Sequence, residues 1–237
     1  MTGKERMRAG EGTAWIGSAG VVIWNGVVPE ATEIFERWHD EEHIDERLSI
    51  PGFVRARRAL AVDGSGEYLT LYEVAHAAAL TAGAYPARLN APTDWTRRVL
   101  PLFRGAARSL CRVAARFGDG GADHLVAVRL PEDGPPLPET LEALAAAGAR
   151  LVATKRLLGF ALLLRDDDLT ARRTAEHDLR RERLAAPSGL VIGEAEDAGR
   201  AGAAARTFCT ILGSAQSVRG STVYRVQARR MAGSQGA

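Results

Sequence analysis

The segment from Glu30 to Phe53 contains the residues whose types and spacing are best suited to chemistry. His39 and His43 lie four residues apart, a spacing that brings two side chains onto one face of a helix. Acidic residues lie between them, so that the run reads HDEEH. A histidine close to a carboxylate can act as a general acid or base near neutral pH, and we predict Glu42 and His43 as the catalytic residues.

A metal ion is the other chemistry that two histidines at this spacing indicate. The run resembles the zinc motif HExxH, in which the second residue is a glutamate that serves as the general base. Here that position is Asp40, and no third ligand stands out farther along the chain. We therefore predict that these histidines bind no metal.

The segment is predicted to form an amphipathic helix that starts at Pro29 and runs to about Ser49. Successive residues of a straight helix are about 100° apart. On this wheel the buried sector is defined by Ile34, Phe35 and Trp38. The helix must then lie with this sector against a sheet, and any polar residue inside the sector faces the interior.

Glu42 falls within the buried sector, between Phe35 and Trp38 on the wheel. A carboxylate in that position either transfers protons or forms a structural ion pair with a strand arginine. His43 lies about 100° farther round, and it faces the interior only if the helix ends or tightens near Asp45. The alternative for His43 is a surface or capping histidine.

Apolar and β-branched residues predict four strands and a second helical region around this helix. The predicted strands are Ala19–Val27, Phe53–Val62, Tyr68–Val74 and Ala107–Phe117. The second helical region runs from Ala77 to about Asn90, and a proline-containing loop separates it from the fourth strand. The first half therefore has the order strand, helix, strand, strand, helix, strand of a ferredoxin-like unit.

Tyrosine and arginine side chains alternate along two of these strands. Tyr68 and Tyr72 share one face, so their hydroxyls suit a substrate carbonyl, although aromatic residues at this spacing are more often core. Arg55 and Arg57 share a face of the preceding strand, where they hold an enolate or carboxylate, pair with Glu42, or point to solvent. With two residues of the later loop, the predicted substrate-binding residues are Trp38, His39, Arg55, Arg57, Tyr68, Tyr72, Trp95 and Arg97.

The same order of elements recurs more weakly after residues 118–121, and this recurrence indicates an internal duplication. In the second half the charged segment Asp166–Leu184 is predicted to be an extra helix with a solvated face. We expect an α+β fold in which tandem ferredoxin-like units form one intramolecular barrel, with two antiparallel sheets back to back and helices outside. The predicted divisions are a flexible N-terminus (1–18), a first unit with the pocket (19–118), a second, degenerate unit (123–230) and a flexible tail (231–237).

The composition is that of a globular protein, with 46% hydrophobic and 25% charged residues among 237. A net charge of +2 is too balanced to favour nucleic acid or an anionic membrane as a partner. Cys111 and Cys209 lack the spacing of a redox or metal motif, which indicates reduced thiols. The N-terminus has no apolar signal region, and no run reaches the ~20 apolar residues of a membrane span. We predict a cytoplasmic protein.

Three groups of residues carry a likeness to a known family: Trp38 with Glu42-His43, Glu46-Arg47 and Pro51-Gly52-Phe53; YLTLYE at 68–73; and TDWTRR at 93–98. They resemble the dimeric α+β barrel superfamily and, within it, EthD-like bacterial proteins. The resemblance covers 19–118 well and 123–230 only faintly. It implies that small molecules bind between sheet and helices. Members carry out cofactor-free monooxygenation, polyketide cyclisation, lactone isomerisation or haem-dependent reactions, so the fold does not fix the function.

The leading hypothesis is a cofactor-free enzyme that cyclises, isomerises or dehydrates a small hydrophobic, aromatic or polyketide-like molecule by acid–base catalysis. The first alternative, which the resemblance implies, is a haem enzyme with His43 or His177 as the axial ligand. The second alternative is a non-catalytic binding protein whose cavity is filled by side chains. We expect a monomeric pseudo-dimer or a homodimer.

Overall fold

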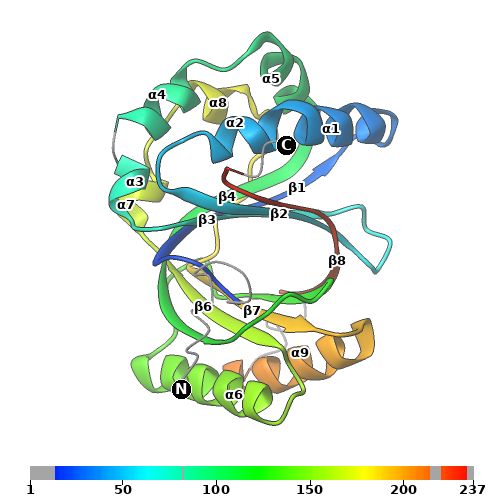
Figure 1. Cartoon of the computed structure of the whole chain (residues 1–237), viewed down its shortest axis with the longest axis vertical. Coiled ribbons are helices and arrows are strands. Elements are labelled where there is room, and N and C mark those ends of the chain that lie inside the picture. Colours follow the sequence, from blue (N-terminus) through cyan, green and yellow to red (C-terminus); the bar gives the residue numbers. More distant parts are fainter. Residues whose placement is uncertain (1–13, 82, 214–219, 234–237) are drawn as a thin grey trace, which may run out of the picture.

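The computed structural model describes residues 14–81, 83–213 and 220–233 (Figure 1). In these residues eight antiparallel strands close into one barrel in the order β1-β3-β2-β8-β5-β7-β6-β4. The first half contributes β1 (Ala19–Val27), β2 (Phe53–Ala61), β3 (Tyr68–Val74) and β4 (Phe103–Gly118). The second half contributes β5 (His124–Arg129), β6 (Gly159–Arg165), β7 (Gly189–Ala195) and β8 (Ser221–Met231).

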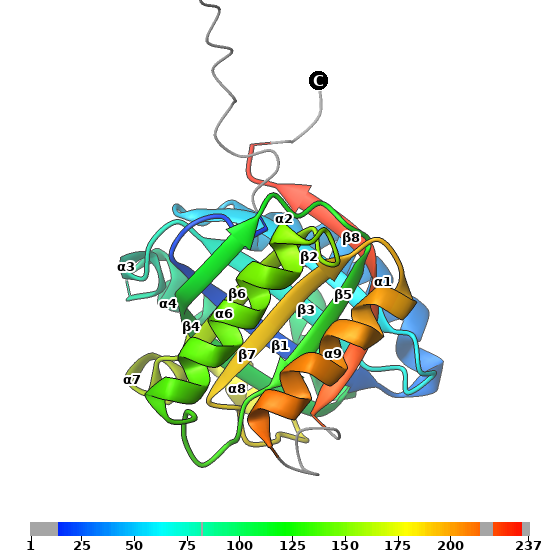
Figure 2. The ribbon, with the colours of Figure 1, turned by 90° about the horizontal axis from the view of Figure 1, so that it is seen from below.

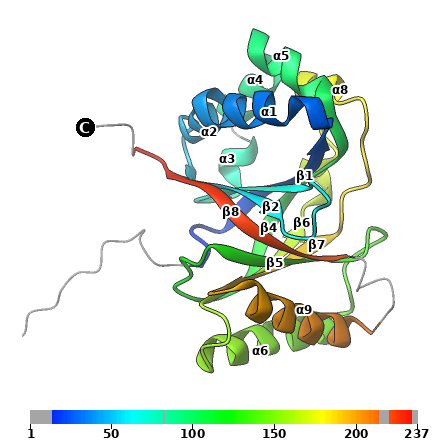
Figure 3. The same cartoon turned by 90° about the vertical axis from the view of Figure 1, so that its right-hand side faces the viewer.

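Helices cover the barrel on two opposite sides, so the α+β fold with outer helices is confirmed (Figures 1 and 3). One side carries α6 (Pro138–Ala153) and α9 (Ala198–Leu212). The other side carries α1 (Thr32–Trp38), α2 (Ile44–Leu48), α3 (Ala78–Thr81), α4 (Ala84–Asn90), α5 (Asp94–Val99), α7 (Asp167–Thr170) and α8 (Ala175–Leu179). Short 3-10 turns precede α1 and follow α5, at Pro29–Ala31 and Leu100–Leu102.

The two sheets are not separate layers packed back to back, as the sequence suggested. Two strands are long enough to belong to both halves: β4 spans 16 residues and pairs with β1 and β6, and β8 spans 11 residues and pairs with β2 and β5. Closure pairs every sheet edge, which removes the unpaired backbone groups that an open edge would expose. The fourth predicted strand, Ala107–Phe117, was therefore too short.

Two helix predictions were also wrong in detail. The region expected as one helix from Ala77 to Asn90 contains the separate helices α3 and α4, and the loop after it contains α5. Residues 166–184 form α7 and α8 with extended chain between them instead of one solvated helix. This segment leaves the second half and packs against helices of the first half, where α8 lies beside α4 (Figure 1). It therefore belongs to the candidate site described below.

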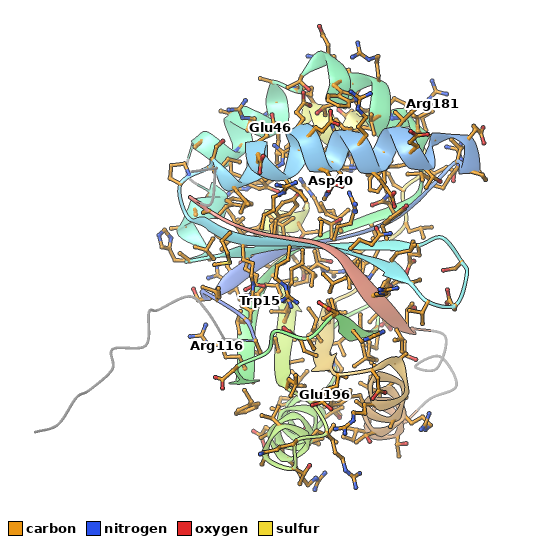
Figure 4. All side chains as sticks on the ribbon, turned by 45° about the vertical axis from the view of Figure 1, so that its right-hand side comes forward. Trp15, Asp40, Glu46, Arg116, Arg181 and Glu196 are labelled. Atoms are coloured by element: carbon orange, nitrogen blue, oxygen red, sulfur yellow. The ribbon has the colours of Figure 1, made fainter. Side chains whose placement is uncertain are left out.

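Side chains fill the interior of the barrel. Its apolar core includes Trp15, Trp24 and Tyr224, together with leucines and alanines from all around the sheet. Trp15 belongs to the segment 1–18 that was predicted to be flexible, yet it is completely buried inside the barrel (Figure 4). Residues 1–13 and 234–237 of the predicted flexible ends lie outside the described residues. The barrel interior is therefore a packed core, and a ligand site must lie elsewhere.

A buried charged cluster completes this interior. Arg55 Nε and Arg57 Nη2 lie 2.7 and 2.9 Å from Glu73 Oε1, and Arg57 Nη1 lies 2.6 Å from Glu194 Oε1. Glu73 Oε2 also accepts a hydrogen bond from the amide of Ile16. The prediction that both arginines share a face is confirmed, but the expectations that they point to solvent or pair with Glu42 were wrong. They hold the N-terminal segment in the barrel.

The second half packs its two long helices tightly onto the sheet (Figure 2). Gly148 of α6 lies directly over the ring of Phe160 on β6, and a Cβ atom at Gly148 would be 2.4 Å from that ring. The helix can approach this closely only because residue 148 has no side chain. Across the described ranges, no helix has the length and apolar character needed to cross a membrane.

This contact leads to a stability prediction. The substitution Gly148→Ala should lower the free energy of unfolding by about 1–3 kcal/mol, because the methyl group overpacks the interface with Phe160. Gly202→Ala in α9 is the matched control, since its Cβ would meet only Arg206 Nη1 at 3.8 Å. The control should stabilise the protein by up to about 1 kcal/mol through helix propensity. Urea denaturation measures both, and equal effects of the two substitutions would contradict the tight packing of α6.

Candidate active site

The HDEEH run forms a π-helical turn between α1 and α2. In this turn, His39–His43, the amide of Ile44 donates a hydrogen bond to the carbonyl of His39, five residues earlier. A π turn inserts one extra residue, which moves the following side chains by about one position on the helical wheel. As a result His43 occupies the inward position that a straight helix gives to Glu42. The inward position of His43 thus comes from a widening of the helix at His39–His43, and not from the end or tightening near Asp45 that the sequence suggested.

Two charged contacts fix this turn on the sheet. Arg58 of β2 forms a double hydrogen bond with the carboxylate of Asp40, at 2.9 and 3.0 Å, and it also donates to the carbonyl of Glu36 (Figure 4). A planar guanidinium paired with both oxygens of a carboxylate defines orientation as well as distance. The π turn is therefore held at a defined height above β2.

Glu42 points toward α5 and away from the sheet. It accepts hydrogen bonds from Trp38 Nε1 at 3.2 Å, Thr93 Oγ1 at 2.7 Å and Thr96 Oγ1 at 3.3 Å. The predicted inward orientation was wrong because the wheel assumed a straight helix. Thr93 is also the N-cap residue of α5, since its hydroxyl accepts from the amide of Thr96. Glu42 thus connects α1 to α5, and it does not line the cavities described below.

Both histidines of the turn are buried against the sheet. His39 is 2% exposed and His43 is 4% exposed, and their rings lie between Trp38 and Tyr72. His43 packs against the indole of Trp38 with centroids 4.1 Å apart, and His39 Nε2 lies 3.5 Å from the Tyr72 hydroxyl. Burial lowers the pKa of each histidine well below its ordinary value of 6.5, with smaller contributions from nearby cationic side chains. Both imidazoles are therefore neutral near pH 7.

The lowered histidine pKa values predict a pH-dependent stability. Between each folded-state pKa and 6.5, the unfolded chain binds more protons than the folded chain, so stability falls as the pH drops below about 6.5. Each histidine should contribute a slope of up to about 1.4 kcal/mol per pH unit. Urea denaturation of His43→Gln between pH 7 and about pH 5 should show a shallower slope than the wild type. The control His76→Gln, at an exposed position, should keep the full slope.

Two neighbouring spaces, which share three lining residues, lie between the first-half sheet and its helices. The larger, the apolar cavity, has a volume of about 320 Å³, within the range of small-molecule sites. Its wall combines the apolar residues Leu80, Tyr85, Pro86, Leu89, Leu110 and Leu169 with the polar residues Asn90, Arg108, Arg172, Arg173 and Thr174. The smaller, the inner cavity, has about 10 Å³, roughly the room for one water molecule. It is lined by the polar groups His43, Arg47, Tyr72, Glu176 and Arg180 and shares Tyr85, Leu89 and Arg108 with the apolar cavity.

Tyr85 of α4 stands where the two cavities meet. Its ring packs on Phe53 at 5.2 Å, which fixes its direction, and it is 3% exposed. Within the described part of the chain, no hydrogen bond is found for its hydroxyl, which leaves that group to a ligand or to water. The sequence analysis did not select Tyr85. Tyr85 is one aromatic residue in a short, Ala-rich helical region. Because this region has no periodic apolar pattern, nothing in its sequence indicated that Tyr85 belongs to a site.

The inner cavity is closed by residues of the segment 166–184. Arg47 of α2 forms a buried ion pair with Glu176 of α8, and Arg180 Nη2 lies 3.9 Å from the same carboxylate. The amide of Ala175 donates a hydrogen bond to Asn90 Oδ1 of α4, which holds α8 beside that helix. This segment was expected to be solvated. Its buried members were missed because their partners lie about 130 residues away, in a pairing that no local pattern reveals.

The other predicted substrate-binding residues are distributed unevenly. Of these, Tyr72 lines the inner cavity together with His43, whereas Trp38 and His39 pack against the ring of His43 and do not line the cavity. Tyr68 instead donates a hydrogen bond to Glu36 at 2.8 Å. Trp95 is half-buried, and Cζ of the Arg37 guanidinium lies 5.9 Å from the centroid of its ring. Arg97 is exposed. These last three, and the two arginines inside the barrel, lie outside the cavities described here.

The two histidines predicted as axial ligands of a haem lie beside small spaces. The axial-ligand candidates were His43, beside the inner cavity of about 10 Å³, and His177, beside a separate space of about 140 Å³. Both volumes are below the range of about 300–1,000 Å³ for sites of drug-sized ligands, and a haem is at least as large as such a ligand. Among the described residues, no group of three or more histidine, cysteine or acidic side chains is placed to hold a metal ion.

Comparison with family models finds no match, and comparison with curated proteins also finds none. Solved structures do match. An anthrone oxidase-like protein is 15% identical, covers 95% of this chain and 98% of its own, and superposes with a TM-score of 0.60. A presumed monooxygenase from Fusobacterium nucleatum is 11% identical, covers 91% and 95%, and has a TM-score of 0.51. The chain shares the α+β barrel fold of these proteins, and at such identities the likeness concerns the fold alone.

Proposed function

We propose that this protein is an enzyme that acts, without an organic cofactor, on a small hydrophobic molecule of the aromatic or polyketide-like class. The observation that carries the proposal is the apolar cavity of about 320 Å³, whose inner end meets the neutral His43 and the unpartnered hydroxyl of Tyr85. Apolar walls with a few convergent polar groups are the usual composition of a small-molecule site. The space beside His43 is too small for an organic cofactor, and this favours a cofactor-free reaction.

The polar groups at the inner end suit the formation of an enolate. A neutral imidazole accepts a proton from an acidic C–H group, while the Tyr85 hydroxyl donates a hydrogen bond to the carbonyl oxygen that becomes negatively charged. Arg108 supplies positive charge on the same side of the apolar cavity. Glu42 acts in this proposal as a positioning residue, because it connects the helix that carries His43 to α5. Cyclisation, isomerisation and dehydration all proceed through such an enolate.

The names of the similar structures suggest oxygenation as the reaction to test first. An enolate of anthrone is electron-rich and transfers electrons to O₂. The methylene carbon loses a proton to the base, a C–O bond forms at that carbon, and the O–O bond then breaks with loss of water. One anthrone and one O₂ thus give one anthraquinone and one water. The organic substrate is oxidised and O₂ is reduced, so the balance needs no further reductant.

The experiment is oxygen consumption and quinone formation with anthrone as the substrate. The wild type should accelerate both above the rate without enzyme, and Tyr85→Phe should lower kcat/KM by about 10²–10³-fold, the usual effect of removing one oxyanion donor. Tyr224→Phe removes the same group from the barrel interior and should leave kcat/KM of the folded protein unchanged. If the wild type does not accelerate the reaction, oxygenation is ruled out. If Tyr85→Phe behaves like Tyr224→Phe, the assigned role of Tyr85 is ruled out.

Two finer relationships belong to the same proposal. We propose that the halves are tandem ferredoxin-like units, because the barrel order places the fourth, first, third and second strand of each half side by side in the same sequence. One chain closes the barrel alone, which favours a monomeric pseudo-dimer. A closer relationship to EthD-like proteins rests on the sequence resemblance.

Purified protein titrated with haemin should develop no Soret band, and a band that disappears in His43→Ala or His177→Ala would support the haem alternative.

A further inference from the structure

A third space, the basic cavity, lies next to the inner cavity and is formed by β4 and the segment 170–186. Its volume is about 140 Å³. Four basic side chains line it: Arg108, His177, Arg180 and Arg183. Among the described residues that form its wall, none is acidic. A cavity with several cations and no carboxylate in its wall has the charge that attracts an anion.

Two arginines of this cavity have buried donors that no protein group satisfies. In the described part of the chain, Arg180 Nε and Arg108 Nη1 are both inaccessible to solvent and without a hydrogen-bond partner. Arg180 as a whole is only 6% exposed, and Arg108 uses its other terminal nitrogen for the carbonyl of Arg172. A buried N–H without an acceptor costs about 1–3 kcal/mol, so these donors are expected to bind an acceptor that is not part of the chain.

The surrounding charges point to an anionic acceptor. Glu176 is the carboxylate nearest to Arg180, at 3.9 Å, but its other oxygen already pairs with Arg47. Burial, with smaller contributions from Arg108 and Arg47, lowers the pKa of Arg180 to about 10, while Glu176 opposes the shift. Glu46 also contacts Arg47, at 3.3 Å, so Arg47, Arg108 and Arg180 share two carboxylates, Glu46 and Glu176. The cluster still carries excess positive charge in a buried place, where a neutral acceptor such as water compensates less than an anion does.

Arg108 connects this anion site to the apolar cavity. It lines the apolar cavity, the inner cavity and the basic cavity, and Arg180 lines the last two. A ligand whose hydrophobic body fills the apolar cavity can thus place a polar end against both arginines. We propose that the natural ligand is an aromatic acid, with a carboxylate or phosphate group that binds between Arg108 and Arg180. This inference rests on the proposed function insofar as it assigns the hydrophobic body to the apolar cavity.

Isothermal titration calorimetry in phosphate-free buffer tests the proposal with four probes: naphthoate, naphthyl phosphate, the neutral isostere naphthamide, and inorganic phosphate. We expect naphthoate or naphthyl phosphate to bind at least about tenfold more tightly than naphthamide, a difference of about 1.4 kcal/mol. The tighter of the two anions identifies the acid group. Inorganic phosphate should bind more weakly than naphthyl phosphate, because it leaves the apolar cavity empty.

Substitutions assign the preference to the two arginines. Arg180→Gln and Arg108→Gln should each abolish the tenfold preference for the anion while naphthamide affinity stays the same. Arg180→Lys should retain part of it. Arg206→Gln, which removes one exposed charge from α9 in the other half, is the control for net charge and should bind like the wild type. Near-UV circular dichroism verifies folding, and the half-buried Arg108 provides the second test if the Arg180 variants unfold.

Several outcomes overturn the inference. They are equal affinity for naphthoate, naphthyl phosphate and naphthamide, no binding of either naphthyl anion, or an anion preference that persists in both Gln variants. Equal binding of all three naphthyl probes would leave the proposed function intact, because the apolar cavity would still be in use. An anion preference without any turnover of anthrone would instead support the acid site and count against oxygenation.

Discussion

Replacing Glu73 with Gln is expected to lower the free energy of unfolding by about 3–5 kcal/mol, because it leaves buried positive charge without a counterion. Glu73 is fully buried and accepts from Arg55 and Arg57 through one oxygen and from the amide of Ile16 through the other. The remaining carboxylate of the cluster, Glu194, contacts Arg57 at 2.6 Å and the amide of Gly121 at 2.8 Å. One carboxylate would then face two guanidinium groups inside the barrel.

Urea denaturation at neutral pH measures this loss. Glu196→Gln is the matched control, since Glu196 directly follows β7, the strand of Glu194, is 55% exposed and pairs with Arg200 on the surface (Figure 4). Its effect should stay within about 1 kcal/mol, as for other exposed ion pairs. The double substitution Glu73→Gln with Arg55→Leu should recover part of the lost stability, because it removes one of the two buried cations that Glu73 neutralises. A loss below 1 kcal/mol in Glu73→Gln would show that the cluster does not anchor residues 14–16.

The alternation of strand residues was predictable, but the environment of each face was not. Arg55 and Arg57 share a face, and Tyr68 and Tyr72 share another, as a period of two requires. Both faces of this sheet are buried, one by the barrel core and one by helices, so polarity could not tell them apart. Barrel closure depends on β4 and β8 each pairing with strands of both halves, a long-range property that local patterns do not reveal.

The helical segment that carries HDEEH was predictable from its sequence, but its inward residues were not assigned correctly. A helical wheel carries the assumption of about 3.6 residues per turn from start to end. The π turn at His39–His43 breaks this assumption, and no residue type in HDEEH signals the extra residue. For the same reason, periodicity gave the wrong direction for His43 as well as for Glu42. Tyr85 and Arg108 entered the site only through tertiary packing.

Replacing Glu176 with Gln should detach α8 from the first half before the whole protein unfolds. Glu176 is 1% exposed and is the shared counterion of Arg47 and Arg180. Without it, Arg47 keeps only Glu46, at 3.3 Å, and the buried Arg180 loses its carboxylate partner, a change that costs about 3–5 kcal/mol. The chain on either side of α8 keeps its hydrogen bonds to β4, such as that from the amide of Ala106 to the carbonyl of Glu182. The helix α8 itself has few other polar contacts to the helices, such as the hydrogen bond from Ala175 to Asn90, so the energy should be released by local opening of α8.

Hydrogen exchange followed by mass spectrometry distinguishes local opening from general destabilisation. Peptides that cover α8 should exchange at least about 100-fold faster in Glu176→Gln, the factor that corresponds to about 3 kcal/mol. Peptides from β5 and β7 should keep their wild-type rates, because these strands pair within the barrel and do not contact Glu176. Glu182→Gln is the control within the same segment, where the side chain is 56% exposed and pairs with Arg104. Equal acceleration in all peptides would mean that the segment is part of the global folding unit, and the cavities would then open only when the barrel itself unfolds.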